Sequence, residues 1–203
     1  TGNITLFKAD NTQVEAIDVT SGQVSVSGAA LQINPTANLG SSQSYYLQVA
    51  ATAVDDTSGN SFAGISDATT LNFTAADIVA PIISSISPTD NATGVGANSN
   101  LVVTFNESIA AGSGNITLFK TDGTTVEAMA VGGSRVTISG TTVTIDPTND
   151  LDSSEGYYLQ IAATAIDDTA GNDFAGISDT TTFNFTVADS AGPTLSSAVP
   201  ADD

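Results

Sequence analysis

The chain has 203 residues, with 3 Lys+Arg against 22 Asp+Glu for a formal net charge of −19, and no His, Cys or Trp. Zinc, haem, copper and iron–sulfur centres lose their usual ligands, and thiol chemistry and His-dependent acid–base schemes are excluded. Three basic residues on so negative a chain provide no surface for a phosphate backbone, and the negative charge repels anionic membranes, so we expect no nucleic-acid partner. No segment has about 18 successive apolar residues, so we also expect no membrane insertion.

The remaining composition favours a folded β protein. Hydrophobic residues make up 40% of the chain and charged residues 12%, which is not the composition of a disordered chain. The apolar residues are mostly Val, Ile, Leu, Phe and Ala among many Thr, Ser, Gly and Asn, a mixture that favours strands and turns. No stretch has a convincing helical period. The sequence therefore predicts an all-β fold.

An ungapped internal repeat organises the chain. The segment that begins at Gly2 recurs at Gly114, 112 positions later, and the linker proline Pro81 recurs at Pro193. A period of this length makes each repeat a complete domain. Each proline marks a boundary, because it forbids continuation of a helix and holds the preceding residue extended. We therefore expect a partial repeat at 1–76 that lacks its first strands, a complete repeat at 77–188, and the first strand of a further repeat at 189–203.

Short alternating runs between turn residues predict the strands of the complete repeat. In chain order, strands are expected near residues 82–87, 100–106, 115–120, 125–131, 135–139, 142–146, 157–165 and 181–187. Asp122-Gly123 and Ser139-Gly140 are typical of hairpin turns. The inward faces are predicted to include Leu101, Val103, Phe105, Ile116, Leu118, Val143, Ile145, Phe183 and Phe185.

A Tyr opens the strand after each Leu-containing loop. Tyr157 lies six residues after Leu151, and Leu39 and Tyr45 repeat this spacing. The pattern resembles the tyrosine corner of Ig and fibronectin-type sandwiches, in which the hydroxyl bonds to upstream backbone. An ordinary strand-initiating Tyr is the alternative. Tyr158 alternates to the other face, where we expect one exposed ring and no sugar-stacking platform.

Three segments in order give the complete repeat a family resemblance. Residues 81–92, 101–107 and 167–172 together resemble the bacterial Ig-like repeats of S-layer proteins and of large RTX-type and biofilm adhesins. The resemblance extends over the complete repeat and most of the partial one. It implies tandem Ig-like β-sandwich domains that act as extracellular spacers, often rigidified by calcium, and it implies no catalytic activity.

Acidic side chains are expected to gather at the junctions between repeats. In an Ig-type sandwich, the loop after the second strand and the loop before the last strand lie at the same end, beside the incoming linker. Two carboxylates about 4 Å apart repel by roughly 4 kcal/mol at an effective dielectric near 20, and Ca²⁺ relieves this with 6–8 oxygen ligands. The expected Ca²⁺ ligands are Asp77, Asn106, Glu107, Asp167, Asp168, Asn172 and Asp189, with Asp55, Asp56 and Asn60 repeating the pattern.

The Asp168 segment also invites comparison with an EF-hand loop. With Asp168 as position one, Asn172 is fifth and Asp179 twelfth. The sixth position is Asp173 instead of the required Gly, and no helices are expected on either side, so an EF-hand is rejected. The alternative to a calcium site is an Asx-rich turn, in which Asp and Asn bond their own backbone.

The interpretation is a structural extension module of a secreted, cell-surface adhesin or biofilm-matrix protein, and not an enzyme. Ca²⁺ stiffens it at inter-domain junctions, and its partners are neighbouring repeats of the same chain. The alternative is a subunit of a self-assembling extracellular filament or S-layer, with copies of itself as partners. The missing strands of the first repeat motivate this alternative, because a neighbouring chain could supply them.

Overall fold

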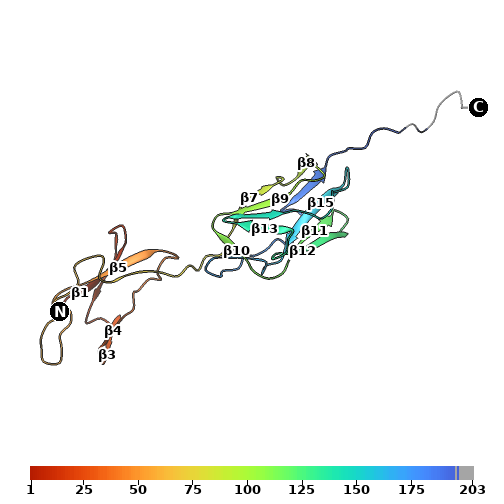
Figure 1. Ribbon diagram of the computed structural model, residues 1–203. Helices are drawn as coiled ribbons and strands as arrows, with labels where there is room; N and C mark the ends of the chain where they lie inside the picture. Colours follow the sequence, from red (N-terminus) through yellow and green to blue (C-terminus); the bar gives the residue numbers. More distant parts are fainter. Residues whose placement is uncertain (195, 197–203) are drawn as a thin grey trace, which may run out of the picture. The chain divides into compact units, whose positions relative to one another are not determined.

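The computed structural model describes residues 1–194 and 196, and every regular element within them is a β-strand (Figure 1). No helix among these residues is long and apolar enough to cross a membrane. The chain divides into two compact units, Thr1–Ile78 and Val79–Asp203. The strand predicted within 189–203 falls on a segment that extends outside the described residues.

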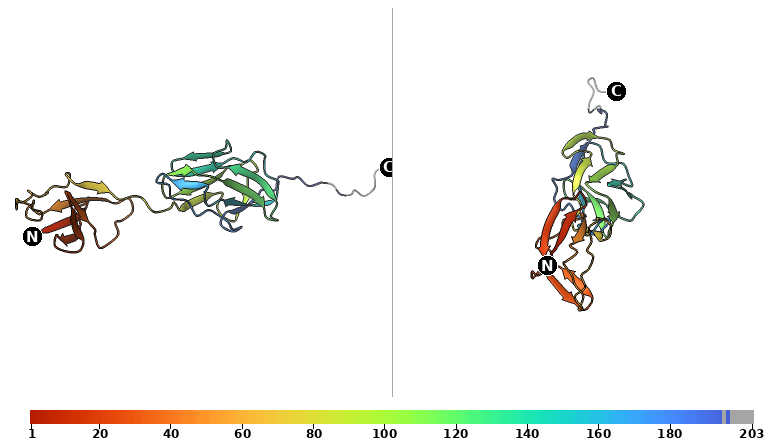
Figure 2. Two further views of the ribbon diagram at one scale, coloured as in Figure 1. Left: turned by 90° about the horizontal axis from the view of Figure 1, so that it is seen from below. Right: turned by 90° about the vertical axis from the view of Figure 1, so that its left-hand side faces the viewer.

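The second unit contains two main sheets and one small one, which Figure 2 shows from two further sides. A five-stranded sheet has the order β12-β11-β15-β17-β8, a four-stranded sheet has the order β13-β14-β9-β7, and β10 pairs with β16. The strands are β7 (Ile83–Ser87), β8 (Ala92–Val95), β9 (Leu101–Phe105), β10 (Ile109–Ala111), β11 (Asn115–Lys120), β12 (Thr125–Ala130), β13 (Val136–Ser139), β14 (Thr142–Ile145), β15 (Gly156–Ile161), β16 (Ile166–Asp168) and β17 (Asn184–Val187).

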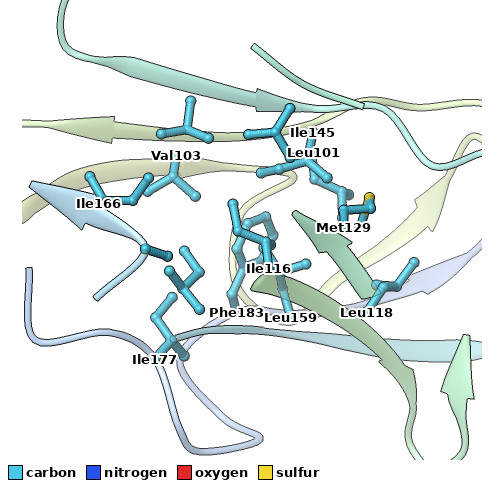
Figure 3. Close-up of a cluster of buried hydrophobic side chains, with 14 of the residues drawn as sticks. Leu101, Val103, Ile116, Leu118, Met129, Ile145, Leu159, Ile166, Ile177 and Phe183 are labelled. Atoms are coloured by element: carbon cyan, nitrogen blue, oxygen red, sulfur yellow. The ribbon is translucent and has the colours of Figure 1, made fainter. Parts of the chain in front are cut away.

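The core of the second unit lies between these sheets, because alternate residues of each strand point to the same side. Figure 3 shows side chains from both sheets meeting there. Fully burying a Leu, Ile or Phe side chain contributes about 1.5–3 kcal/mol. All nine predicted inward residues are buried, with exposures of 2% or less: Leu101, Val103, Phe105, Ile116, Leu118, Val143, Ile145, Phe183 and Phe185.

Two predicted strands have different bounds in the structure. The strand predicted at 157–165 ends at Ile161, and a turn then leads into the separate strand β16. The strand predicted from residue 181 begins at Asn184, because Asp179 Oδ1 accepts the backbone N–H groups of Thr181 and Thr182, each at 2.7 Å. Those N–H groups are therefore not available to the sheet. The short strands β8 and β10 were not predicted.

The tyrosine corner is confirmed in both units. The hydroxyl of Tyr157 accepts the backbone N–H of Asp152 at 2.8 Å, and that of Tyr45 accepts the N–H of Gly40 at 2.8 Å. The expectation of an exposed neighbouring ring is wrong, because Tyr158 is only 8% exposed. Phe119 stacks on it across the strand pair, with ring centroids 5.0 Å apart, and leaves no open aromatic platform.

The first unit repeats part of this architecture. It contains β1 (Asn3–Lys8), β2 (Gln13–Asp18), β3 (Val24–Ser27), β4 (Ala30–Ile33), β5 (Ser44–Val49) and β6 (Asn72–Thr74). One sheet has the order β2-β1-β5-β6, and β3 and β4 form a separate hairpin. The register is also repeated: Ile4 pairs with Val49 as Ile116 pairs with Ile161. The unit therefore reproduces the arrangement of β11–β15 and β17, and contains no counterparts of β7–β10.

Candidate metal centre

Acidic side chains from two separate segments meet at one end of the second unit. The pairing of β10 with β16 places Ile109 opposite Asp168 and Ala110 opposite Asp167. This pairing brings the loop before β10, which carries Glu107, beside the carboxylates of β16. One carboxylate oxygen of Glu107 lies within 4.8 Å of one of Asp168. The sheet pairing, and not a single loop, therefore assembles this acidic end.

Asp168 is held in an Asx turn of its own loop. It is 3% exposed, and its Oδ1 accepts the backbone N–H groups of Ala170 and Asn172, each at 2.8 Å. Its Oδ2 accepts the side-chain amide of Asn172 at 2.7 Å. The side-chain and backbone hydrogen bonds from Asn172 lower the pKa of Asp168, so this carboxylate stays ionised at neutral pH. The expected Asx-rich turn is present.

The first unit has the same turn without the second acidic segment. Asp56 Oδ1 accepts the N–H groups of Ser58 at 2.9 Å and Asn60 at 2.8 Å, and its Oδ2 accepts the Asn60 amide at 2.8 Å. The bonds from Asn60 lower the pKa of Asp56. At the repeat offset the counterpart of Glu107 falls before Thr1, outside this sequence. Asp56 and Asn60 thus form the same Asx turn as Asp168 and Asn172.

Asp167 differs from its counterpart Asp55. In the first unit the hydroxyl of Ser61 donates to Asp55 Oδ1 at 2.6 Å. In the second unit Asp173 replaces that serine and bridges to Asp167 in the same antiparallel pairing. Asp167 Oδ1 is buried and has no hydrogen-bond partner among the described residues. Burial raises the pKa of Asp167, and a hydrogen bond with Asp173 and the charges of Asp173 and Asp168 raise it further.

The other predicted ligands have separate positions. Asn106 Oδ1 accepts the N–H of Ile82 at 2.7 Å, and its own N–H donates to the Ile82 carbonyl at 3.0 Å, which fastens the incoming segment beside Glu107. Within the first unit, Asp77 accepts the Ser41 hydroxyl at 2.6 Å. Asp189 follows β17 at the opposite end of the second unit and accepts the N–H of Ala191 at 2.9 Å (Figure 1).

Asp173 is not among the Ca²⁺ ligands that the sequence predicts, where it appears only as the residue that breaks the EF-hand pattern. The sequence nevertheless distinguishes it, because at the corresponding position the first repeat has Ser61, whose hydroxyl donates to Asp55. In the second repeat a carboxylate replaces that donor. The consequence is a group of three neighbouring carboxylates on one strand and its adjoining loop: Asp167, Asp168 and Asp173.

Replacing Asp173 with the serine of the first repeat is expected to stabilise the second unit. At pH 7 the hydroxyl donates to Asp167 and one like charge is removed, a gain of about 1–2 kcal/mol. The raised pKa of Asp167 means that the wild-type fold favours the protonated acid. The stabilising contribution of protonated Asp167 to folding is complete below the ordinary pKa of Asp, and it is lost as the pH rises through the raised pKa of Asp167. The advantage of D173S over wild type should therefore grow from pH 3 to pH 8.

Denaturant unfolding in EDTA, followed by hydrogen exchange of the second unit, measures this difference. Ser61→Asp in the first unit is the reciprocal variant and should destabilise that unit at neutral pH. Equal stabilities of wild type and D173S at every pH would contradict the expected repulsion.

Two facing sheets with a tyrosine corner define the second unit as an immunoglobulin-like β-sandwich. The family described as bacterial Ig-like domain matches residues 1–75 and 77–187, and the chain belongs to this family. Both matched segments therefore belong to the same family. No curated protein matches the chain.

Solved structures that match the chain are similar to it at low identity. CopC from Methylosinus trichosporium OB3b is 15% identical with a TM-score of 0.39, over 56% of this chain and 99% of CopC. The S-layer protein rSbsC(31-844) is 20% identical with a TM-score of 0.36, over 57% of this chain and 14% of that chain. The BSP domain of a biofilm-associated protein is 16% identical with a TM-score of 0.27, over 94% of this chain and 25% of that chain. The last two matches thus span a quarter or less of those proteins.

Proposed function

We propose that the chain is a structural extension module of a secreted, cell-surface adhesin or biofilm-matrix protein, and that Ca²⁺ stiffens the junction between its consecutive repeats. The observation that carries this proposal is the approach of Glu107 to Asp168 within 4.8 Å. The preceding residue of the same strand, Asp167, has a buried oxygen with no hydrogen-bond partner among the described residues. Membership of the bacterial Ig-like domain family supports a structural role.

The donor set fits a hard cation. The ligands available at this end are carboxylate and amide oxygens, and such oxygens are the ligands that Ca²⁺ prefers, in flexible geometry. The two basic side chains of the second unit form ion pairs with other residues: Lys120 with Asp152 at 2.7 Å, and Arg135 with Asp146 at 3.5 Å. A bound cation would supply the positive charge that the carboxylates lack. The proposed ligands in the second unit are Asn106, Glu107, Asp167, Asp168 and Asn172.

The incoming linker supports a role for Asp77. Ile82 is fastened to Asn106 by two hydrogen bonds, and Asp77 precedes it by five residues. Five extended residues reach at most about 18 Å, so the backbone of Asp77 stays within that distance of Ile82. A cation that takes ligands from Asp77 and from the second unit would restrict the bending of the linker. Asp189 offers the same carboxylate to a following repeat.

Calcium is expected to stabilise the full chain. For a Kd of about 0.1 mM and calcium at about 1–10 mM, one site adds about 1.4–2.7 kcal/mol. The measurement is a thermal melt of the full chain with calcium, with magnesium and with EDTA. Asp168→Asn should remove the calcium response of the second unit. Asp56→Asn is the matched control, because it alters the same turn where no counterpart of Glu107 exists, and it should leave that response intact.

Small-angle scattering of the full chain tests the mechanical part. For wild type, calcium should increase the maximum dimension of the chain and narrow the range of dimensions that it samples. For Asp168→Asn, calcium should change neither quantity. A melt and a scattering curve that are identical with calcium and with EDTA would reject calcium stiffening. They would leave the spacer role to be tested by the mass of the chain in solution.

The second candidate is a subunit of a self-assembling extracellular filament or S-layer. The observation that favours it is the exposure of apolar side chains in the first unit, where Phe62 is 45%, Leu71 40% and Phe73 37% exposed. Sedimentation across a range of concentrations separates the two candidates. A monomer at all concentrations supports the spacer, and polymers that grow with concentration support the filament.

A further inference from the structure

The loop at each tyrosine corner also holds the segment by which the chain leaves that repeat. In the first unit, the hydroxyl of Ser41 donates to Asp77 Oδ1 at 2.6 Å and accepts the backbone N–H of Ile78 at 2.9 Å. One hydroxyl can make both bonds, because it has one O–H donor and two acceptor lone pairs. The distance to Asp77 is in the range of a charge-assisted bond to an ionised carboxylate. Ser41 therefore fastens two consecutive residues of the departing chain.

The second unit has the same arrangement at the repeat offset. The hydroxyl of Ser153 donates to Asp189 Oδ1 at 3.4 Å and accepts the backbone N–H of Ser190 at 2.8 Å. The residue after the aspartate is Ile78 in the first repeat and Ser190 in the second, so the shared feature is a bond to the backbone and not to one kind of side chain. We call Ser41 and Ser153 the clamp serines.

The backbone on both sides of each clamp serine is held in place. The tyrosine corner binds the N–H of the residue before it. The residues after the clamp serines, Ser42 and Ser154, have positive φ angles of 54° and 61°, which are uncommon outside glycine. In this conformation the N–H of Ser42 donates to the Ala76 carbonyl and that of Ser154 to the Ala188 carbonyl, each at 3.3 Å. Such strained backbone persists only where the surrounding contacts impose it, and here it recurs at the same position of both repeats.

The linker is also anchored where it enters the second unit. Asn106 fastens Ile82 by two hydrogen bonds, so three residues, 79–81, lie between that anchor and the one at Ile78. Pro81 has a fixed φ, and the residue before a proline is confined to extended conformations. Few backbone rotations therefore remain between the two anchors.

We propose that the clamp serines set the direction in which the chain leaves each repeat, and that they limit the bending of the linker without a bound cation. With the clamp closed, rotation is confined to residues 79–81. Without the Ser41 hydroxyl, residues 77 and 78 are released as well, and the rotating stretch grows from three residues to five. This inference rests on the proposed spacer role and is independent of its calcium part, because every bond that it uses is within the protein.

The test compares Ser41→Ala with wild type in the full chain and in EDTA. We expect the amide of Ile78 to exchange about tenfold faster in the variant, because its acceptor is removed. Small-angle scattering should show that the variant samples a wider range of dimensions. The core amides of the first unit should exchange as in wild type, which separates a loosened linker from a destabilised unit. Ser41→Thr keeps the hydroxyl and should restore the slow exchange at Ile78.

Ser58→Ala is the matched control, because it removes a serine hydroxyl from the same unit and the second repeat has Ala170 at that position. It should change neither the exchange at Ile78 nor the range of dimensions. Ser153→Ala should speed exchange at the Ser190 amide and leave Ile78 unchanged. If Ser41→Ala unfolds the first unit, this second variant decides the question.

Two results would overturn the proposal. One is an unchanged exchange rate at Ile78 in Ser41→Ala, or a change that Ser58→Ala reproduces. The other is a range of dimensions in EDTA that is the same for Ser41→Ala and wild type. Neither result depends on calcium, so they are distinct from a failed calcium response of the wild-type chain, which rejects calcium stiffening alone, and from polymers in sedimentation, which reject the spacer role.

Discussion

Replacing Phe185 by alanine is expected to lower the free energy of unfolding of the second unit by about 3–5 kcal/mol. Phe185 is 2% exposed and packs between Tyr157, at a centroid distance of 5.7 Å, and Phe183, at 6.3 Å. Its removal leaves a cavity between two sheets that the neighbouring strands prevent from collapsing. The loss thus combines the transfer of the ring to water with the unfilled space.

The counterpart in the first unit should respond weakly. Phe73 stacks on Tyr45 at the same centroid distance of 5.7 Å, but it is 37% exposed, because no strand covers it. Phe73→Ala is therefore expected to cost about 1 kcal/mol, close to the ordinary effect of a half-exposed substitution. The two variants share the stacked pair and differ in the covering segment, so their difference measures that segment's contribution.

Hydrogen exchange along a denaturant series resolves the two units, because each unit's own amides report its unfolding. Equal costs at Phe73 and Phe185 would contradict the expected effect of burial.

The sequence contained the information for most of the core. Alternation alone identified Leu101, Val103 and Phe105 as one buried face, and the glycines of Asp122-Gly123 and Ser139-Gly140 marked two hairpins that the structure contains. These features depend on residues close in the chain, so a local pattern reports them. The full repeat also showed which segment the first unit lacks, because the two copies align without a gap.

The short strands and the state of each carboxylate depend on distant residues. Strand β8 (Ala92–Val95) has little alternation and exists because β17 offers a parallel edge to it. Strand β16 forms opposite β10, and each of these strands has three residues. Likewise, the raised pKa of Asp167 follows from its burial and from Asp173, which the turn after β16 brings back to it. Composition shows an excess of acid, and only the pairing shows which acids meet.

The loop that carries the acidic cluster is fixed by a glycine. Gly176 has a φ of +81°, and a Cβ added there would lie 2.6 Å from the Ile161 carbonyl oxygen and 2.9 Å from the Ala163 nitrogen. Both contacts are with backbone, which cannot rotate away as a side chain can. The close approach is what allows Ile177 to bridge to Ile161 and so anchors the far end of the loop that begins at Asp168.

Gly176→Ala is therefore expected to destabilise the second unit by about 3–4 kcal/mol, because the positive φ costs about 1–2 kcal/mol and the backbone must also move. Gly171→Ala is the matched control: its φ is +91° and nothing lies within 4 Å of the added Cβ, so only the φ strain of about 1–2 kcal/mol applies. The measurement is again unfolding followed by hydrogen exchange of the second unit.

The same comparison separates the anchoring of the loop from the stability of the sandwich. In Gly176→Ala, the N–H of Asn172, which Asp168 holds, should exchange faster relative to the core than in Gly171→Ala, since the bridge at Ile177 is strained. Gly64→Ala should have the corresponding effect in the first unit, where the added Cβ would lie 2.5 Å from the Val49 carbonyl oxygen. Equal costs at Gly176 and Gly171 would mean that the segment shifts to accept the methyl group. In that case the loop, and the spacing of its carboxylates, would be set by the Asx turn alone.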